Sequence, residues 1–243
     1  RKGICGAILR STATERSLVE RMAAEELPLV MLGDHYEHAT LPFIYADSSA
    51  ASRQAIEHLL SLGHTRVAFA ACEREDGDHR DRFDAYRSTL ESRGLMHPDL
   101  VGRIPPHRMD GEKLIRNLMG MPDRPTAVFI ADPLVAVGAI NEAHKMGVKI
   151  PEDLSIVGFD DTDIRSLIYP KMTAICQDSR MLGQRAFERV VGLISSDDKK
   201  PEPARGHAAW LEINETTAPP PEVAYHVLPN RTRVAGGQRS VAQ

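Results

Sequence analysis

The sequence is poor in cysteine, has no excess of positive charge and lacks long apolar runs. Its three cysteines, Cys5, Cys72 and Cys176, form no CxxC pair, which argues against a disulfide framework or a zinc site and suits a reducing cytoplasm. The formal net charge of −4 gives no basic surface for nucleic acid. No apolar run approaches the roughly 18 residues of a membrane span, and no signal peptide opens the chain. We therefore expect a cytoplasmic chain with no membrane contact.

Motifs for catalysis and for cofactor binding are also missing. The ten histidines show no HExxH or other ligand spacing, so no metal site is expected. No GxGxxG follows a strand, and the chain has neither a P-loop lysine nor a GxSxG elbow. We therefore expect no cofactor, no catalytic residue and no enzyme activity. An enzyme for small substrates stays open only by analogy with the many uses of such folds.

The chain instead alternates short apolar strands with amphipathic helices. Its 243 residues, 42% hydrophobic and 26% charged, suffice for one large or two modest globular domains. Strands are predicted at residues 6–9, 29–32, 43–46, 67–71, 127–131, 155–159 and 208–213. Helices are predicted at residues 15–26, 49–62, 81–93, 111–119, 133–146 and 180–195. This alternation predicts an α/β fold of parallel sheets with helices on both faces.

Three consecutive prolines at 219–221 end this alternation. Beyond them the chain is rich in arginine, glycine and glutamine with little periodicity, so residues 219–243 are expected to form a disordered tail. Contact with DNA through Arg231, Arg233 and Arg239 is a minor alternative for this tail.

The stretch from residue 150 to residue 177 carries the functional prediction. Residues 155–159 form an apolar run with β-branched members, typical of an interior strand of a parallel sheet. Asp160 and Asp161 follow its carboxyl end, where ligands bind in open α/β sheets. The alternative is that one of the pair, most simply Asp161, only caps the next short helix. Asp132 similarly follows the strand at 127–131, where it is also expected to cap a helix that opens with Pro133.

Several sequence motifs resemble those of one family. PEDLSIVGFDD followed by YP and MTAICQD, together with IEHLLSLGHTRVAF and PTAVFIADPLVAVGAI, is similar to the lactose-repressor/galactose-repressor family of bacterial transcription regulators. The resemblance implies a periplasmic-binding-protein-like fold of two parallel-sheet α/β subdomains joined by hinge crossings. It places residues 1–46 and 177–206 in an incomplete amino-terminal subdomain, and residues 47–176 and 207–218 in the carboxyl-terminal one.

The resemblance also implies a set of ligand-binding residues. Arg82, in RFDAY, looks like the effector-contacting arginine of the family's Arg-x-x-Gly-Tyr motif, although Ala85 replaces the glycine. Asp132 stands where the family usually has asparagine, which predicts a different effector from the better-known sugars. The remaining expected ligand contacts are Asp160, Phe159, Tyr45 and Gln177, and the expected hinge residues are Asp47 and Gln177.

Each of these residues also has a simpler interpretation. Arg82 could be a solvated member of the charged run HRDR, and Gln177 could make only a hinge hydrogen bond. Tyr45 and Phe159 are more often core residues than stacking surfaces. Asp34 lies one place past the position where the family often has an acidic residue, which leaves its role open. His64 is expected to be structural, tying a helix end to a strand.

Carboxylates that accept hydrogen bonds and a guanidinium that donates them can together satisfy the hydroxyl groups of a sugar or polyol. Two carboxylates in one cleft disfavour an anionic ligand and leave a neutral polyol or a cation-bearing compound. Together with the resemblance, which implies a transcription regulator, the leading hypothesis is the effector-binding and dimerisation core of such a regulator. Operator DNA would be bound only through a helix-turn-helix headpiece, which this sequence lacks. The alternative is a solute-binding receptor of a sugar transporter. A homodimer is expected by resemblance, with a weak suggestion that its surface includes Leu167, Ile168 and Tyr169.

Overall fold

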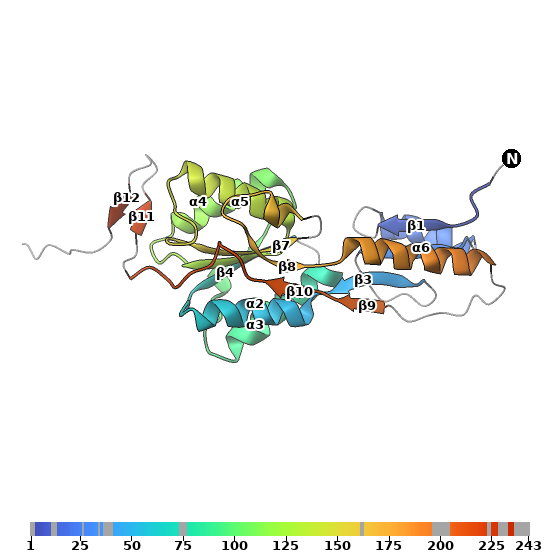
Figure 1. Cartoon of the computed structure of the whole chain (residues 1–243), viewed down its shortest axis with the longest axis horizontal. Helices are drawn as coiled ribbons and strands as arrows, with labels where there is room; N and C mark the ends of the chain where they lie inside the picture. Colours follow the sequence, from blue (N-terminus) through green and yellow to red (C-terminus); the bar gives the residue numbers. More distant parts are fainter. Residues whose placement is uncertain are drawn as a thin grey trace, which may run out of the picture.

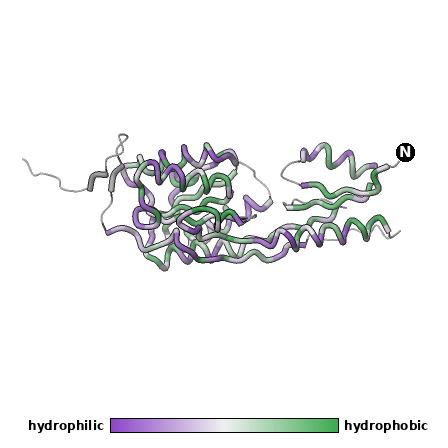
Figure 2. Tube along the Cα trace, turned by 45° about the horizontal axis from the view of Figure 1, so that its top comes forward, coloured by the Kyte–Doolittle hydropathy of each residue, from purple (hydrophilic) through white to green (hydrophobic). Residues whose placement is uncertain are grey.

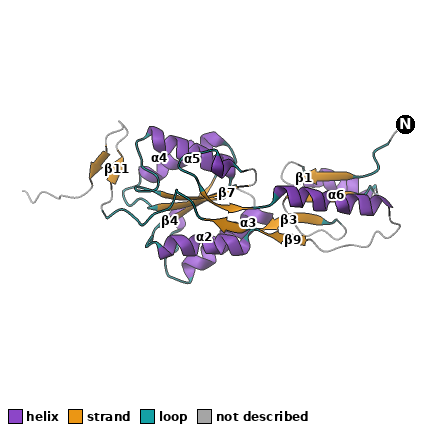
Figure 3. Ribbon diagram, in the orientation of Figure 1, coloured by secondary structure: helices purple, strands orange, loops and turns teal. Residues whose placement is uncertain are grey.

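The computed structural model describes residues 3–10, 14–25, 27–33, 35, 41–72, 77–160, 163–195, 205–222, 225–227 and 233–235. These residues form two α/β units, one larger and one smaller, that lie end to end along the long axis of the molecule (Figures 1 and 3). The predicted α/β class with parallel sheets is confirmed. Asp34 and Asp161 lie outside the described residues.

The larger unit is built on a six-stranded sheet of order β10-β8-β7-β6-β4-β5. Neighbouring strands are parallel except that β10 runs antiparallel to β8. The interior strands are continuous apolar runs because both of their faces are covered by helices. The strands are β4 (Val67–Ala71), β5 (Val101–Arg103), β6 (Ala127–Ile130), β7 (Ser155–Asp160), β8 (Thr173–Cys176) and β10 (Trp210–Glu212).

Alternate residues of each strand pack against opposite helix layers. One layer holds α2 (Ser49–Ser61) and α3 (Gly77–Glu91), and the other holds α4 (Arg108–Met119) and α5 (Pro133–Lys145), as Figure 1 shows. The hydrophobic residues accordingly concentrate along the sheet, and the polar ones on the outer helix faces (Figure 2). The backbones of α4 and α5 approach so closely that a Cβ atom built on Gly138 would lie 1.9 Å from the carbonyl oxygen of Arg108.

The smaller unit has a four-stranded sheet of order β1-β2-β3-β9, all parallel. Its face carrying Val30 and Ile44 packs against Leu182, Ala186 and Val190 of α6. Its other face packs against Val19 of α1. The elements are β1 (Ala7–Arg10), α1 (Arg16–Ala24), β2 (Leu29–Gly33), β3 (Phe43–Asp47), α6 (Ser179–Ser195) and β9 (Arg205–Ala208).

The chain passes between the two units at three points. β3 leads into α2 at Asp47, β8 leads into α6 through Gln177, and β9 leads into β10 at Ala209. The backbone N–H of Ala209 donates to the carbonyl of Asp47 at 3.0 Å, which joins two of the crossings directly. The third crossing falls two residues later than the expected boundary at 206/207, because residues 207 and 208 pair with β3. The single strand predicted at 208–213 is therefore divided between two sheets.

Two further segments differ from the predictions. Helix α3 begins at Gly77 rather than at residue 81, because the charged residues before Arg82 form its first turn, with Asp78 near the positive helix end. Within the expected disordered tail, β11 (Tyr225–Val227) pairs antiparallel with β12 (Arg233–Ala235). Among the described helices, none is long and apolar enough to cross a membrane. Of the suggested dimer residues, Leu167 and Tyr169 are exposed, whereas Ile168 packs partly against the core.

Candidate effector site at the strand ends

The site lies where the carboxyl ends of both parallel sheets meet the crossings. β3 of the smaller unit and β8 of the larger unit each end at a crossing, so the carboxyl edges of the two sheets face the same junction. In open parallel sheets this edge is where ligands bind, because the backbone turns away there and leaves polar groups at the strand ends. The short connection after Ala131 brings Asp132 to this edge, and Asp160 ends β7.

Arg82, a predicted site residue, is held in place from several sides. It is buried, 4% exposed, and its guanidinium donates to the hydroxyl of Ser48 at 3.1 Å and to the carbonyl of Ala131 at 3.0 Å. A third nitrogen lies 3.5 Å from Asp78. Its Cζ atom lies 3.6 Å from the centre of the Phe159 ring, a cation–π contact. Arg82 is therefore not a solvated surface residue: it ties the first crossing, at Ser48, to the ends of β6 and β7.

Asp160 is also buried, 1% exposed, and is the acceptor for a neighbouring arginine that the sequence analysis overlooked. Nη1 of Arg165 lies 2.6 Å from one carboxylate oxygen, and the backbone N–H of Ile164 donates to the other at 2.9 Å. Arg165 extends the network to Glu212 on β10, whose second oxygen accepts from Lys171. The arginine lies five residues after Asp160, on the turn that the aspartate caps, and that spacing is the signal that could have revealed it.

Asp132 caps α5 as predicted, because its carboxylate accepts from the backbone N–H groups of Leu134 at 2.9 Å and Val135 at 3.1 Å. At the crossings, Asp47 accepts from the N–H of Ser49 at 3.1 Å, and the side chain of Gln177 lies 3.4 Å from the hydroxyl of Ser179. Both crossing residues are thus engaged in local contacts at the starts of α2 and α6.

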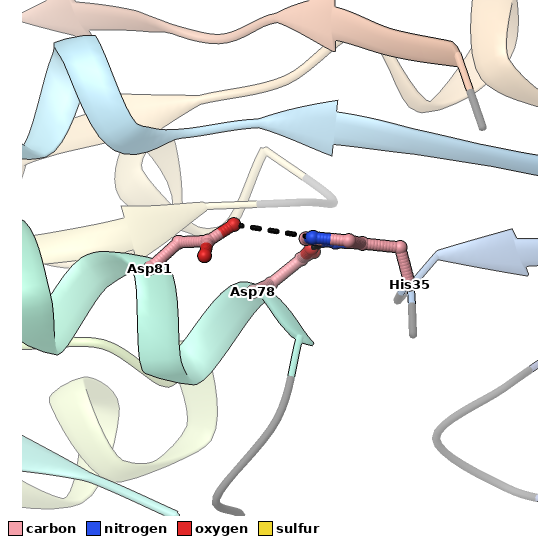
Figure 4. Close-up of side chains that lie close together, drawn as sticks. All are labelled: His35, Asp78 and Asp81. Atoms are coloured by element: carbon pink, nitrogen blue, oxygen red, sulfur yellow. Dashed lines mark hydrogen bonds and ion pairs between the residues drawn. The ribbon is translucent and has the colours of Figure 1, made fainter. Parts of the chain in front are cut away.

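Tyr45 stacks on a histidine that the sequence analysis did not single out. The rings of His35 and Tyr45 lie 4.1 Å apart at an angle of 20°. The His35 ring also faces two aspartates of α3, as Figure 4 shows: Nδ1 lies 3.2 Å from Asp78, and Nε2 lies 3.5 Å from Asp81. His35 follows β2 of the smaller unit, whereas α3 belongs to the larger one, so these contacts span the gap between the units.

Burial and the surrounding carboxylates change the acidity of this cluster. Burial raises the pKa of Tyr45, and Asp47, Asp81 and Asp78 raise it further. Burial likewise raises the pKa of Asp81, while His35 opposes that change. No spacing in the sequence joins residue 35 to residues 78 and 81, so only the folded chain reveals this cluster.

The candidate residues thus include several hydrogen-bond acceptors, the buried guanidinium of Arg82 and two stacked rings. Such a set can accept hydrogen bonds from hydroxyl or amine groups and can cover an apolar ring face. A separate hollow lies between the first turns of α3 and the strands β4 and β5, and none of the predicted site residues lines it. It is lined by residues that include Phe69, Cys72, His79, Phe83 and Arg103.

Comparison with known proteins agrees with this architecture. Residues 56–216 match the periplasmic binding protein-like domain. The HTH-type transcriptional repressor CytR of Escherichia coli K12 is 32% identical over 161 residues, which cover 66% of this chain and 47% of CytR. The chain spans about half the length of the curated relatives it matches first.

Solved structures agree as well. A LacI family regulator from Enterococcus faecium, solved with bound ribose, superimposes with a TM-score of 0.80 at 25% identity, over 90% of this chain and 81% of that one. A LacI family regulator from Mycobacterium smegmatis gives a TM-score of 0.77 at 28% identity, over 89% of this chain and 80% of that one.

Two parallel α/β units joined by three crossings define a periplasmic-binding-protein-like core. This chain belongs to the periplasmic binding protein-like domain family, and the proteins it is similar to include an HTH-type transcriptional repressor and LacI family regulators. The relatives named above are regulators rather than enzymes.

Proposed function

We propose that this chain binds a small, polar, hydroxyl-bearing effector, of the sugar or polyol type, at the junction of its two sheets. The ligand contacts would come from Arg82, Asp132, Asp160, Phe159, Tyr45 and Gln177, and the hinge from Asp47 and Gln177. Asp160 and Phe159 would in addition hold the guanidinium groups of Arg165 and Arg82 in place at this junction.

The position of Arg82 is the observation that supports this proposal most strongly. Its guanidinium contacts Ser48 at a crossing, Ala131 at the end of β6 and Phe159 on β7. A ligand that formed a hydrogen bond with Arg82 would therefore be coupled both to the first crossing, at Ser48, and to the strand ends of the larger unit. Such a link lets ligand binding shift the population between an open and a closed arrangement.

Isothermal titration of the whole chain against a panel of pentoses, hexoses, polyols and nucleosides tests the proposal. Asp132→Asn is the informative variant, because asparagine still caps a helix but replaces the carboxylate with a neutral amide. We expect it to weaken binding by about tenfold, equivalent to roughly 1.4 kcal/mol, the scale of one hydrogen bond between a ligand and a charged group.

Asp123→Asn is the matched control. Asp123 is largely exposed and precedes β6, at the opposite edge of the sheet. The control should bind as the unmodified chain does. Equal affinities for both variants, or no binding of any panel member by the folded chain, would contradict the proposal.

We further propose that the full regulator acts on operator DNA through a headpiece outside these residues, from the cytoplasm and as a homodimer. The name of the CytR relative supports the DNA-binding part of this proposal, because it is of the HTH type. The alternative of a transporter receptor is not favoured, since the curated relatives are regulators.

A further inference from the structure

The contact between His35 and two aspartates is the part of the junction that effector binding does not explain. We propose that His35, when protonated, acts as a latch that holds the two units closed by pairing with Asp78 and Asp81 at the same time. The latch needs no effector, so it stands or fails independently of the proposed function.

The latch joins parts of the molecule that the three crossings do not join. His35 follows β2 of the smaller unit, and both aspartates lie in the first turns of α3 of the larger unit (Figure 4). If the units moved apart at this point, both ion pairs would break together. The closed state has the ion pairs of His35 with Asp78 and Asp81, and the open state lacks them. A difference of this kind between two states is what a conformational switch requires.

The arrangement of the carboxylates favours a proton as the cation. A neutral imidazole donates from one ring nitrogen only, so its second nitrogen would present a lone pair to a carboxylate. The imidazolium donates from both, and here each ring nitrogen has its own carboxylate, at 3.2 Å and 3.5 Å. The three side chains are also close enough to share a metal ion, but a metal would use one ring nitrogen and draw both carboxylates to it. The one-to-one pairing fits a doubly donating ring better.

Charged and titratable groups face His35 from the elements packed against it. From α3 the ring faces Asp78 and Asp81, with Arg82 beside Asp78 as a competing cation at 3.5 Å. From β3 it faces Tyr45, with Asp47 near enough to act on both Tyr45 and Asp81. The ring of Tyr45 also shields one face of the imidazole.

The sign of the effect follows from which state holds the proton more tightly. The closed state gives the imidazolium two carboxylate partners, so protonation favours closure, and closure is lost as the pH rises and the imidazolium gives up its proton. Closure is also lost at strongly acidic pH, where the aspartates become neutral.

Small-angle X-ray scattering of the ligand-free chain between pH 5.5 and pH 8.5, in EDTA, measures the latch. We expect a smaller radius of gyration at pH 5.5, with a closed-to-open ratio at least about fivefold higher than at pH 8.5, the lower end of typical coupling between sites. His35→Gln and Asp81→Asn should each abolish this change with pH while leaving the circular dichroism spectrum intact. The control His107→Gln, an exposed histidine at the start of α4, should keep it.

A radius that does not change with pH would overturn the proposal. A change that persists in both His35→Gln and Asp81→Asn would also overturn it. If the radius of gyration at pH 8.5 decreased only after zinc was added, the cluster would be a metal site and the proposal would be wrong.

Discussion

Replacing Arg165 with methionine should destabilise the larger unit substantially. Arg165 is the cation nearest the Asp160 carboxylate, whose side chain is completely buried. Breaking a buried ion pair by removing one partner costs about 3–5 kcal/mol. Here the arginine side chain is 19% exposed, and Asp160 keeps backbone N–H donors from Ile164 and Arg165. We therefore expect a loss of about 2–3 kcal/mol of unfolding free energy, below the full value for a buried pair.

Urea unfolding followed by the fluorescence of Trp210 measures this loss. Trp210 is the single tryptophan of the chain and lies on β10, two residues from the Glu212 partner of Arg165, so it reports on the unit that is changed. The midpoint should fall while the slope with urea stays constant, as expected when stability changes but the exposed surface does not.

Arg185→Met is the matched control for this prediction. Arg185 pairs with Glu188 at 3.0 Å on the exposed side of α6. A pair of this kind contributes about 0–1 kcal/mol, so the control should shift the midpoint little. If Arg165→Met cost no more than Arg185→Met, the view that Asp160 is held by a buried ion pair would be wrong.

Three further predictions concern other parts of the chain. Gly138→Ala should destabilise by roughly 2 kcal/mol or more, since its added methyl overlaps the backbone of α4, whereas Gly183→Ala, in open space on α6, should raise the melting temperature slightly. Burial lowers the pKa of His64 in the folded chain, so the unfolded chain binds a proton at His64 more tightly than the folded chain does. The folded state should therefore lose stability as the pH falls below about 6.5. The melting temperature should accordingly be lower at pH 5.5 than at pH 7.5. Burial raises the pKa of the Cys176 thiol to about 11, so at pH 8 iodoacetamide should alkylate the exposed Cys5 and spare Cys176 until urea unfolds the chain, which mass spectrometry can follow.

The periodicity of the sequence predicted most of the larger unit, because its strands are apolar on both faces and its helices carry clear start and stop residues. Asp132 illustrates this: a strand, an aspartate and a proline in sequence specify a cap, and the cap is present. His64 lies between the helix end and the sheet, bonded to Thr126 and Ser155. Both features depend on local order along the chain, which the sequence displays directly.

The parts that were missed depend on contacts between distant segments. The helix start at Gly77 was hidden by charged residues that resemble a loop, and the junction between His35 and α3 joins residues more than forty positions apart. The sequence also does not predict that residues 205–212 are divided between two sheets, because both halves of this segment have a composition typical of strands. For residues 205–212, pairing between strands rather than propensity decides the outcome.

The order of strands in the smaller unit has a consequence for synthesis. β3 pairs on one side with β2, which precedes it closely, and on the other with β9, which is made more than 150 residues later. α6, which covers one face of that sheet, is also late. A ribosome therefore releases nearly all of the six-stranded unit while one face of the first three strands of the smaller sheet still lacks its covering helix and β3 still has a free edge. The nascent chain must keep those strands from joining other polypeptides until α6 and β9 have emerged.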